Sequence, residues 1–482
     1  QYYLLNKNMN GFFRVLYEQK LFDYITDAWI AGYLSSEFDK FTLISDEYAF
    51  MLSGYITATR YLQFLKKVSV KEAENPTYLI WNSIIYSLVT VDSLFCEKHE
   101  SDSKDAIPSF RLFALEIVNP IWTAIDQWNI ADTDSEDIIN LRALLISALV
   151  RFEDDDVIDY GYNLLMRTAV KNGTISVTAS GEITGIDTNI LQQVIECALA
   201  YQSSQTSETE DLLGAFVSVY SSLNSEYQTY VLRAIGAVYA NQQLHGKALQ
   251  FVLQSGLVRD QDKLRGLYSL RRCYGREQTW TYLADQGFWE QLFEIYGSGF
   301  SAQDITEIAD TFASLAYYEN VYEFYYKQSG HKTSSNERSV NETLENIQVN
   351  IQWIDENYDE VAQYLVDSLT VITSTTQQST TPMIEDDGKT PKKKGIVWKV
   401  VLFLLVAVGF CVFGVWWILK KRGWSTKKMF AYQRQSDVIM DESDTKAMIS
   451  TNATARNEYN MTMNVASIDD DVDRHHDDDA NL

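Results

Sequence analysis

The stretch Leu141–Phe152, LRALLISALVRF, shows the pattern that decides the fold. Its apolar side chains recur at intervals of three and four residues: Leu141, Leu144, Leu145, Ala148, Leu149 and Phe152. Because an α-helix has about 3.6 residues per turn, this spacing places all six on one face. The stretch therefore predicts an amphipathic helix that buries one side.

The same period extends outward over residues 21–369. Near the end of this region it recurs at Leu344, Ile347, Ile351, Ile354, Tyr358, Val361 and Leu365. We count about fifteen helical segments, separated by short breakers such as Asn75-Pro76 and Ser255-Gly256. Helices joined in this way bury their apolar faces by stacking on sequence neighbours. We predict an all-α fold, an irregular α-solenoid of HEAT/armadillo-like helix pairs; an ordinary globular helical bundle is the alternative.

Two segments break the helical period. Residues 1–20 contain two short apolar runs around Asn10-Gly11, a strong hairpin signal, and indicate the end of a β-sandwich domain. Residues Thr174 to Thr184 alternate Val, Ile, Thr and Gly too densely for a helix. We expect a small hairpin or loop there. Because the chain starts at Gln1 without an initiator Met, we also expect an N-terminal part upstream.

The C-terminal region changes character three times. Residues 370–394 are rich in Ser, Thr and Gln and then in charges, which predicts a flexible stalk. Residues 395–420 contain Val400–Leu419, an uncharged run long enough to span a bilayer as one helix. A buried core helix is the alternative interpretation. Residues 421–482 are polar and predict a disordered tail.

Neither flanking charges nor glycosylation sequons decide the orientation of this transmembrane helix. Lys and Arg number five on its leading side and six on its trailing side. The positive-inside rule therefore hardly favours either orientation. Sequons begin at Asn172 and Asn341 in the large first part, and at Asn452 and Asn460 in the tail. We take Asn172 and Asn341 as the candidate N-glycosylation sites.

Charge and cysteine content limit the classes of partner. The formal net charge is −26 and most of it precedes the apolar run, which argues against nucleic acid, whose phosphates need Lys and Arg. Cys96, Cys197 and Cys273 allow at most one internal disulfide in the large part and leave an odd thiol. This count does not settle the redox compartment.

No catalytic or metal-ligating constellation emerges from the sequence. It contains no HExxH, GxSxG, P-loop or GxGxxG pattern. We interpret Glu153–Asp156 as a solvated helix boundary, since consecutive acids on a helix point in different directions. The cluster of Arg271, Arg272 and Arg276 is interpreted as pairing with helix-end carbonyls or with carboxylates. We therefore assign no catalytic and no metal residue to this chain.

Several strings occur in the order in which they appear in the zinc aminopeptidase N family. They are LLNKNMNGFFRVLYEQKLF from Leu4, Leu43-Ile-Ser-Asp46 with Ala49 and Gly54, Leu257–Asp262, Gly275-Arg276 with Trp280 and Leu283, and Leu344-Glu345 with Ile347, Asn350, Ile351 and Trp353. The region from Leu4 to Leu369 resembles the endoplasmic-reticulum-aminopeptidase-like C-terminal domain of that family. The resemblance implies a bowl of HEAT-like helix pairs that closes over a separate catalytic domain.

In that family the catalytic domain carries HExxH and GAMEN motifs, and neither occurs here. The resemblance implies that zinc belongs to that missing domain, that this chain holds no cofactor, and that the chain alone is inactive. Our leading hypothesis is the substrate-enclosing C-terminal domain of a membrane-bound zinc aminopeptidase, with peptides as its partners. The alternative is a non-catalytic, membrane-anchored module that binds peptides or proteins.

The resemblance also places the helical domain outside the cell or in a lumen, with the tail in the cytosol. The expected partners are then the lipid bilayer and a cytosolic adaptor, to which the last residues, Asp479 to Leu482, offer a free carboxylate. A transmembrane helix after the helical domain departs from the family pattern, in which the anchor usually lies at the N-terminus or is a lipid at the C-terminus.

Overall fold

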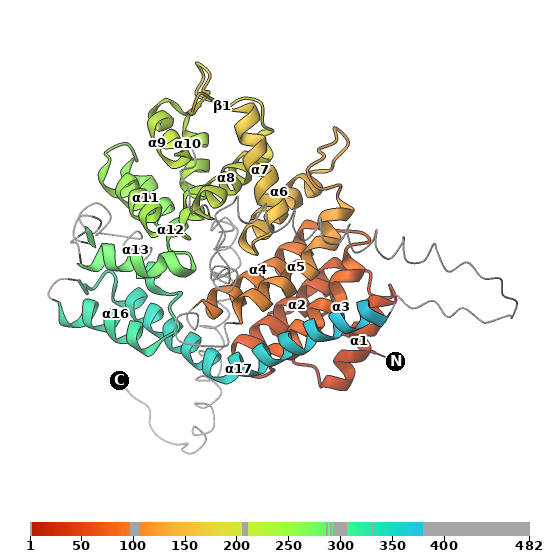
Figure 1. Cartoon of the computed structure of the whole chain (residues 1–482). Coiled ribbons are helices and arrows are strands. Elements are labelled where there is room, and N and C mark those ends of the chain that lie inside the picture. Colours follow the sequence, from red (N-terminus) through yellow and green to blue (C-terminus); the bar gives the residue numbers. More distant parts are fainter. Residues whose placement is uncertain are drawn as a thin grey trace, which may run out of the picture. The chain divides into compact units, whose positions relative to one another are not determined.

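The structure is a computed structural model that describes residues 2–96, 106–204, 211–285, 288–289, 292, 306–328 and 331–378. These residues are predominantly helical (Figure 1), which confirms the all-α class. The α-helices are α1 Gln19–Ile30, α2 Glu37–Leu52, α3 Ala58–Glu72, α4 Tyr78–Phe95, α5 Ile107–Ala124, α6 Glu136–Arg151, α7 Asp155–Thr168, α8 Leu191–Ser204, α9 Leu212–Val219, α10 Ser225–Ala234, α11 Gln242–Gln254, α12 Asp260–Leu270, α13 Cys273–Asp285, α16 Leu315–Lys327 and α17 Glu337–Gln378. Short 3-10 helices are η1 Lys7–Met9, η2 Thr188–Ile190, η3 Tyr220–Ser222, η4 Ile235–Val238 and η5 Glu307–Ala309.

Side chains just before several helices fix where they begin. The Ser36, Thr57, Ser135 and Asp154 side chains each accept a hydrogen bond from a backbone N–H in the first turn of α2, α3, α6 and α7, respectively. Such caps satisfy backbone donors that have no partner inside the helix. The amphipathic stretch from Leu141 lies in α6 up to Arg151, and Leu141, Leu145 and Leu149 are fully buried there.

The helices pack in two rows that follow the order of the chain (Figure 1). In one row α2 contacts α4, α4 contacts α6, α6 contacts α8, α8 contacts α10 and α10 contacts α12. In the other row α1 contacts α3 and α3 contacts α5. Neighbours in sequence, such as α2 and α3 or α5 and α6, join the rows. Each helix therefore buries its apolar face mainly against elements close to it in sequence.

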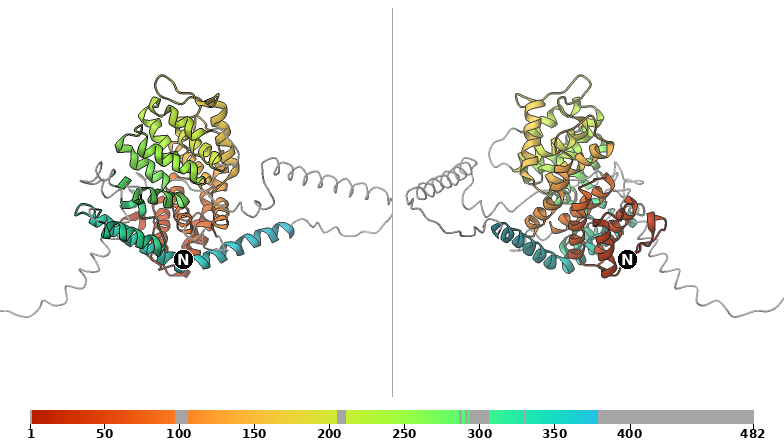
Figure 2. Two further views of the ribbon diagram at one scale, coloured as in Figure 1. Left: turned by 60° about the vertical axis from the view of Figure 1, so that its left-hand side comes forward. Right: turned by 90° about the vertical axis from the view of Figure 1, so that its right-hand side faces the viewer.

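The last long helix returns to the first helices and closes the array (Figure 2). Helix α17 contacts α16 and η5 and also α3, α4 and α5. The Trp353 indole N–H lies 3.1 Å from the Met51 sulfur, and the Ala58 N–H donates to the Asn357 side chain at 3.1 Å. A disulfide between Cys96, after α4, and Cys273, at the start of α13, joins two further parts of the array.

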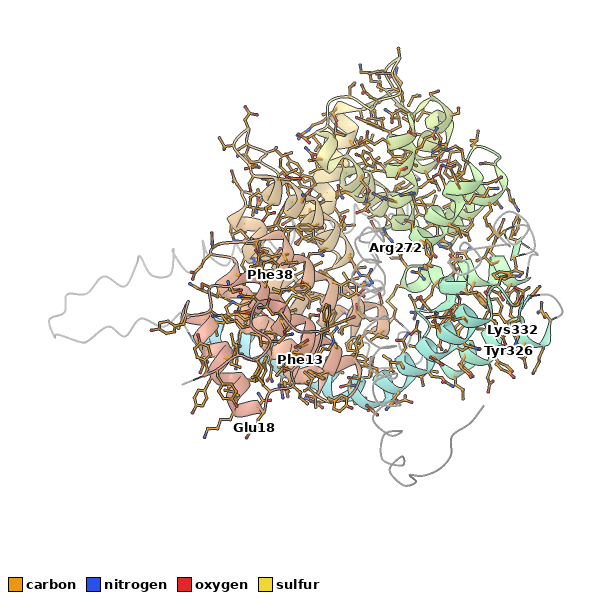
Figure 3. All side chains as sticks on the ribbon, turned by 180° about the vertical axis from the view of Figure 1, so that it is seen from behind. Phe13, Glu18, Phe38, Arg272, Tyr326 and Lys332 are labelled. Atoms are coloured by element: carbon orange, nitrogen blue, oxygen red, sulfur yellow. A yellow bond between two sulfur atoms is a disulfide. The ribbon has the colours of Figure 1, made fainter. Side chains whose placement is uncertain are left out.

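The described residues before α1 form no strand, so the predicted hairpin at Asn10-Gly11 is corrected. A two-residue hairpin turn of the expected type needs positive φ at both central residues, and Asn10 has φ −75°. The segment instead bonds to α2: the Asn8 and Val15 N–H groups donate to Asp39 and Asp46. Figure 3 shows Phe13 over the N-terminal helices. The assignment of residues 1–20 to a β-sandwich domain stays a prediction.

A small hairpin does interrupt the helices close to the predicted place. Strands β1 Val170–Lys171 and β2 Thr174–Ile175 are antiparallel, with Val170 opposite Ile175, and Val177 pairs with Ile183 beyond them. Asn172 and Gly173 connect the strands with φ values of 52° and 73°. This left-handed pair is the geometry that an Asn-Gly turn favours.

At the C-terminal end, α17 continues to Gln378. Residues 370–378, predicted to begin a flexible stalk, are therefore helical; the first proline after them is Pro382. The rest of the stalk, the transmembrane helix at 395–420 and the tail at 421–482 lie outside the described residues. Within the described part, α4 is the helix that is long and apolar enough to cross a membrane, and it is largely buried in the domain. We read α4 as a core helix.

Candidate functional site

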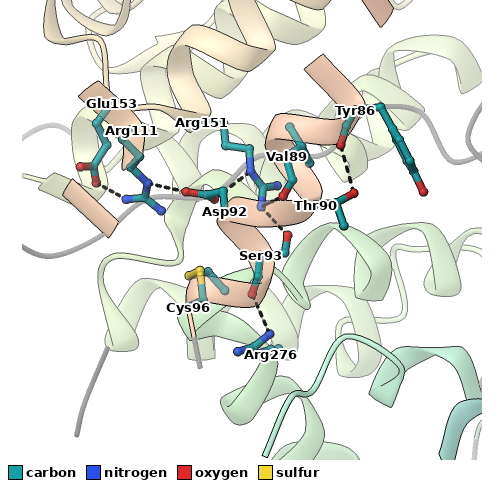
Figure 4. A network of polar contacts seen from close by, with 11 residues as sticks. Tyr86, Val89, Thr90, Asp92, Ser93, Cys96, Arg111, Arg151, Glu153 and Arg276 are labelled. Atoms are coloured by element: carbon teal, nitrogen blue, oxygen red, sulfur yellow. Dashed lines mark hydrogen bonds and ion pairs between the residues drawn. A yellow bond between two sulfur atoms is a disulfide. The ribbon is translucent and has the colours of Figure 1, made fainter. Parts of the chain in front are cut away.

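Asp92 lies at the centre of a buried polar network between α4, α5 and α6 (Figure 4). One carboxylate oxygen accepts from the Arg111 Nε at 2.8 Å and the other from the Arg151 Nε at 3.0 Å. Asp92 is fully buried, and both arginines are at most 4% exposed. Such a carboxylate compensates two guanidinium charges that water does not reach. The network fixes three helices relative to one another.

The network continues towards the disulfide and α13. The Arg151 Nη2 donates to the Ser93 hydroxyl at 2.6 Å, and the Arg276 Nη1 approaches the Ser93 carbonyl oxygen at 3.3 Å. Arg276 also donates to the Thr311 carbonyl oxygen at 2.7 Å. Cys96 lies three residues after Ser93 and is bonded to Cys273. The end of α4 is therefore held to α13 by one covalent bond and by hydrogen bonds beside it.

The three arginines near α12 pair as the sequence interpretation expected. Arg271 forms an ion pair with Asp310 at 2.9 Å, Arg272 contacts Glu196 at 3.7 Å, and Arg276 donates to the two carbonyl groups already described. Burial raises the pKa of the Glu196 and Asp310 carboxyls, against the opposing effect of their arginines. These arginines hold helix ends and loops together, and they bring no reactive group with them.

The acidic cluster at Glu153–Asp156 is a helix boundary, as predicted. Asp154 caps α7 through the Val157 N–H, and Asp155 and Asp156 occupy the first turn. Sequence reasoning missed the role of Glu153, which pairs with the Arg111 Nη1 at 3.1 Å. The sequence signal for this buried network was Asp92, the single acid within the apolar helix α4, because a buried charge requires a buried partner.

Histidine and cysteine side chains in the described part serve the core. The His245 Nε2 lies 3.0 Å from the Leu270 carbonyl oxygen, and burial lowers the pKa of His245 to about 4. The His331 Nδ1 lies 3.1 Å from the Phe324 carbonyl oxygen. Cys197 is a buried free thiol. Among the described residues no group of three or more His, Cys, Asp or Glu side chains could hold a metal ion, so these residues do not fit a zinc ion.

Both candidate glycosylation asparagines are exposed. Asn172 lies in the turn between β1 and β2. Asn341 lies on α17, where its side-chain oxygen accepts from the hydroxyl of Tyr326, a residue beside Lys332 in Figure 3. Thr343 of the second sequon is buried, and its hydroxyl donates to the Thr306 carbonyl oxygen at 3.2 Å. N-glycosylation at both positions stays a prediction.

Residues in the sequence strings that resemble the aminopeptidase family also form ion pairs and hydrogen bonds that stabilise the fold. Arg14 and Asp46 form an ion pair at 3.0 Å, and Arg259 and Asp262 form one at 2.7 Å. The Asn350 amide donates at 3.0 Å to the Asp310 and Phe312 carbonyl oxygens. These residues thus fix the N-terminal segment, the start of α12 and the loop after η5.

Another buried acid, Glu47 on α2, pairs with Arg60 on α3 at 2.8 Å. Burial raises the pKa of Glu47 to about 7, although Arg60 opposes this shift. Because the folded state holds this proton more tightly than the unfolded state, stability falls as the pH rises from the unfolded pKa towards the folded one. The Glu47→Gln variant cannot ionise at this position and should lack this loss. We expect the free energy of unfolding of the variant, relative to that of the wild type, to rise by about 1–3 kcal/mol when the pH is raised from about 5 to about 8.

Thermal and urea unfolding at the two pH values measure this difference. The matched control is Glu116→Gln, because Glu116 pairs with Lys66 while 39% of its side chain is exposed. The control should follow the wild-type pH profile. Parallel profiles for the wild type and Glu47→Gln would contradict the assigned shift.

Fold and site together define a predominantly helical domain in which buried carboxylates pair with buried arginines. The family profile described as the ERAP1-like C-terminal domain matches residues 2–349, more than two thirds of the chain. The chain belongs to this family of aminopeptidase C-terminal domains.

Curated relatives share this region at low identity. The chain is 22% identical over 378 residues to the glutamyl aminopeptidase of Bitis rhinoceros, covering 76% of this chain and 35% of that protein. It is 24% identical over 358 residues to aminopeptidase M1-B of Oryza sativa subsp. japonica, covering 73% and 37%. The aminopeptidase A of Gloydius brevicauda matches at 22% identity over 378 residues, covering 76% and 35%. The chain thus spans about a third of the length of these relatives.

Proposed function

We propose that this chain serves as the C-terminal helical domain of a membrane-bound zinc aminopeptidase and helps to enclose its peptide substrate. The family match over residues 2–349 carries the proposal. The zinc ion and the hydrolytic step belong to a separate catalytic domain, and this chain contributes shape and positioning. The two rows of helices, closed by α17 and by the Cys96–Cys273 disulfide, support a solenoid of HEAT-like pairs.

The proposed location places the helical domain outside the cytosol. Structural disulfides form and persist in oxidising compartments, and the Cys96–Cys273 pair therefore supports a luminal or extracellular domain. Exposure of Asn172 and Asn341 is compatible with glycan attachment there. Residues 395–420 would then anchor the domain in the bilayer, and residues 421–482 would face the cytosol and an adaptor.

The functional test adds the purified full chain, in detergent micelles, to the glutamyl aminopeptidase of Bitis rhinoceros from which the matched region has been removed. We expect the chain alone to release no N-terminal residue from a peptide. We expect the mixture to hydrolyse a long peptide with a lower KM than the truncated enzyme alone, while hydrolysis of a single-residue amide changes little. This contrast follows because the domain would contact only the distal part of a substrate.

Two results would count against this function. Chelator-sensitive release of N-terminal residues by the chain alone would show catalysis within it. An unchanged KM for the long peptide in a mixture that forms a complex would favour the alternative, a non-catalytic membrane-anchored binding module.

A further inference from the structure

The two candidate N-glycosylation sequons differ in how the folded domain presents their threonines. N-glycosylation requires Ser or Thr two residues after the asparagine, so the transferase has to reach this hydroxyl as well as the asparagine amide. In the first sequon Asn172 and Thr174 are both exposed. In the second sequon Asn341 is exposed, but Thr343 is only 2% exposed. The folded domain therefore presents one complete sequon and one incomplete sequon.

The geometry of α17 separates the two residues of the Asn341 sequon. Side chains two positions apart on an α-helix point about 200° apart around its axis. Asn341 therefore faces solvent, and Thr343 faces the core. The Thr343 hydroxyl donates to the carbonyl oxygen of Thr306, which is itself buried, at 3.2 Å. While the helix is intact, an enzyme cannot contact the Asn341 amide and the Thr343 hydroxyl at once.

Packing around Thr343 makes local opening of α17 costly. Val340 and Ile347 lie three and four residues away on the same side of the helix and are fully buried. On the solvent side, the Tyr326 hydroxyl on α16 donates to the Asn341 side-chain oxygen (Figure 3). Segments with many buried contacts open rarely. The Asn341 sequon is thus held in its helical form after the domain has folded.

The Asn172 sequon lies in a much less constrained element. Asn172 is in the turn between β1 and β2, and Thr174 is the first residue of β2. Each strand has two residues, and the hairpin projects beyond the end of α7 in Figure 1. Opening so short and exposed a ladder costs little free energy. A transferase can therefore obtain an extended sequon here without unfolding a helix.

We propose that Asn341 can receive a glycan only before α17 packs onto the domain, whereas Asn172 can still receive one in the folded domain. In either transfer the asparagine Nδ2 forms a bond to C1 of the first sugar and loses a proton. The bond from C1 to the lipid diphosphate of the donor breaks, and the lipid diphosphate leaves with the electron pair. This proposal rests on the proposed luminal location and adds an order of modification to it.

A glycan on Asn341 is compatible with the packed helix once it is attached. The Tyr326 hydroxyl bonds to the oxygen of the Asn341 side chain, and the sugar is joined to the nitrogen, so this hydrogen bond can persist. Because Asn341 is exposed, the bulky glycan stays in solvent. The restriction therefore applies to the time of transfer and not to the stability of the product.

The first arm of the experiment uses the folded full chain, made without glycans in the bacterial periplasm and purified in detergent micelles. The chain is incubated with purified oligosaccharyltransferase and a lipid-linked oligosaccharide, and mass spectrometry measures transfer to each asparagine separately. We expect the initial rate at Asn341 to be at least about tenfold lower than the rate at Asn172, because opening of α17 limits transfer. A cooperative melting transition shows that the acceptor is folded.

The second arm translates the full chain, behind a cleavable signal peptide, in the presence of microsomes. The transferase then meets each sequon as the chain enters the lumen, before α17 has packed. We expect glycans at both Asn172 and Asn341. The matched controls are the Asn172→Gln and Asn341→Gln variants, each of which should lose only the glycan of its own site.

Three results would overturn the proposal: comparable initial rates at both sites of the folded chain, no transfer to Asn172 in the folded chain, or no glycan on Asn341 in microsomes. The signal peptide delivers the chain to the lumen whatever its natural location, so these results do not depend on the proposed function. If the chain from its native membranes carries no glycan while both arms give the expected difference, the luminal location is rejected and the difference between the two sites stands.

Discussion

The Asp92→Ala variant is expected to lose about 3–5 kcal/mol of unfolding free energy, because removing one partner leaves buried charges uncompensated. Arg111 and Arg151 both bind the Asp92 carboxylate, and neither can move into water without repacking α5 or α6. Asp92→Asn should lose less, since its amide oxygen still accepts one hydrogen bond. Urea unfolding followed by far-UV circular dichroism measures the loss.

The control for this variant is Glu116→Ala, which breaks the exposed pair with Lys66. Such surface pairs contribute about 1 kcal/mol or less. The two variants should therefore differ several-fold in their effect. Equal losses for Asp92→Ala and Glu116→Ala would contradict the central role of the buried network.

The Cys96→Ser/Cys273→Ser variant should show the other large effect. The disulfide joins residues that are 177 positions apart, and closing so long a loop destabilises the unfolded state by about 5 kcal/mol at 25 °C through its lost entropy. We expect a correspondingly lower melting temperature for the double variant. The wild type should show the same fall when a reducing agent is added, because reduction opens the same loop.

Cys197→Ala serves as the control, since Cys197 is a buried free thiol. It should lose about 1–2 kcal/mol, the usual cost of a small core cavity. Its melting temperature should still fall on reduction. A wild type whose melting temperature is insensitive to reducing agent would contradict the assigned disulfide.

The helices were predictable because each carries its own signal. The three- and four-residue spacing from Leu141 needs only one buried face, and α6 buries that face. The signal at Asn10-Gly11 failed because a turn signal does not supply a second strand, and the segment found its hydrogen-bond partners on α2 instead. Local patterns thus predict an element but not the neighbour that completes it.

For the candidate site as well, the kind of contact could be predicted from the sequence but the partner could not. Pairing of Arg271, Arg272 and Arg276 with helix-end groups could be expected from their position. The identity of each partner could not, because Asp310, Glu196 and Ser93 come from distant parts of the chain. The closure by α17 was hidden for the same reason: periodicity places Ile354 on a buried face, and nothing in it names Met51 as the contact of the neighbouring Trp353.

This closure has a consequence for how the domain is made. The hydrogen bonds from Trp353 to Met51 and from Ala58 to Asn357 join residues about 300 positions apart along the chain. At a synthesis rate of about 5–20 residues per second, α3 would wait about 15–60 s for α17 to emerge. During that interval the surfaces that α17 later covers stay open to water and to other chains. A newly made domain would therefore carry uncovered apolar surface on α3, α4 and α5 until α17 is complete, and truncation within α17 would leave the array unclosed.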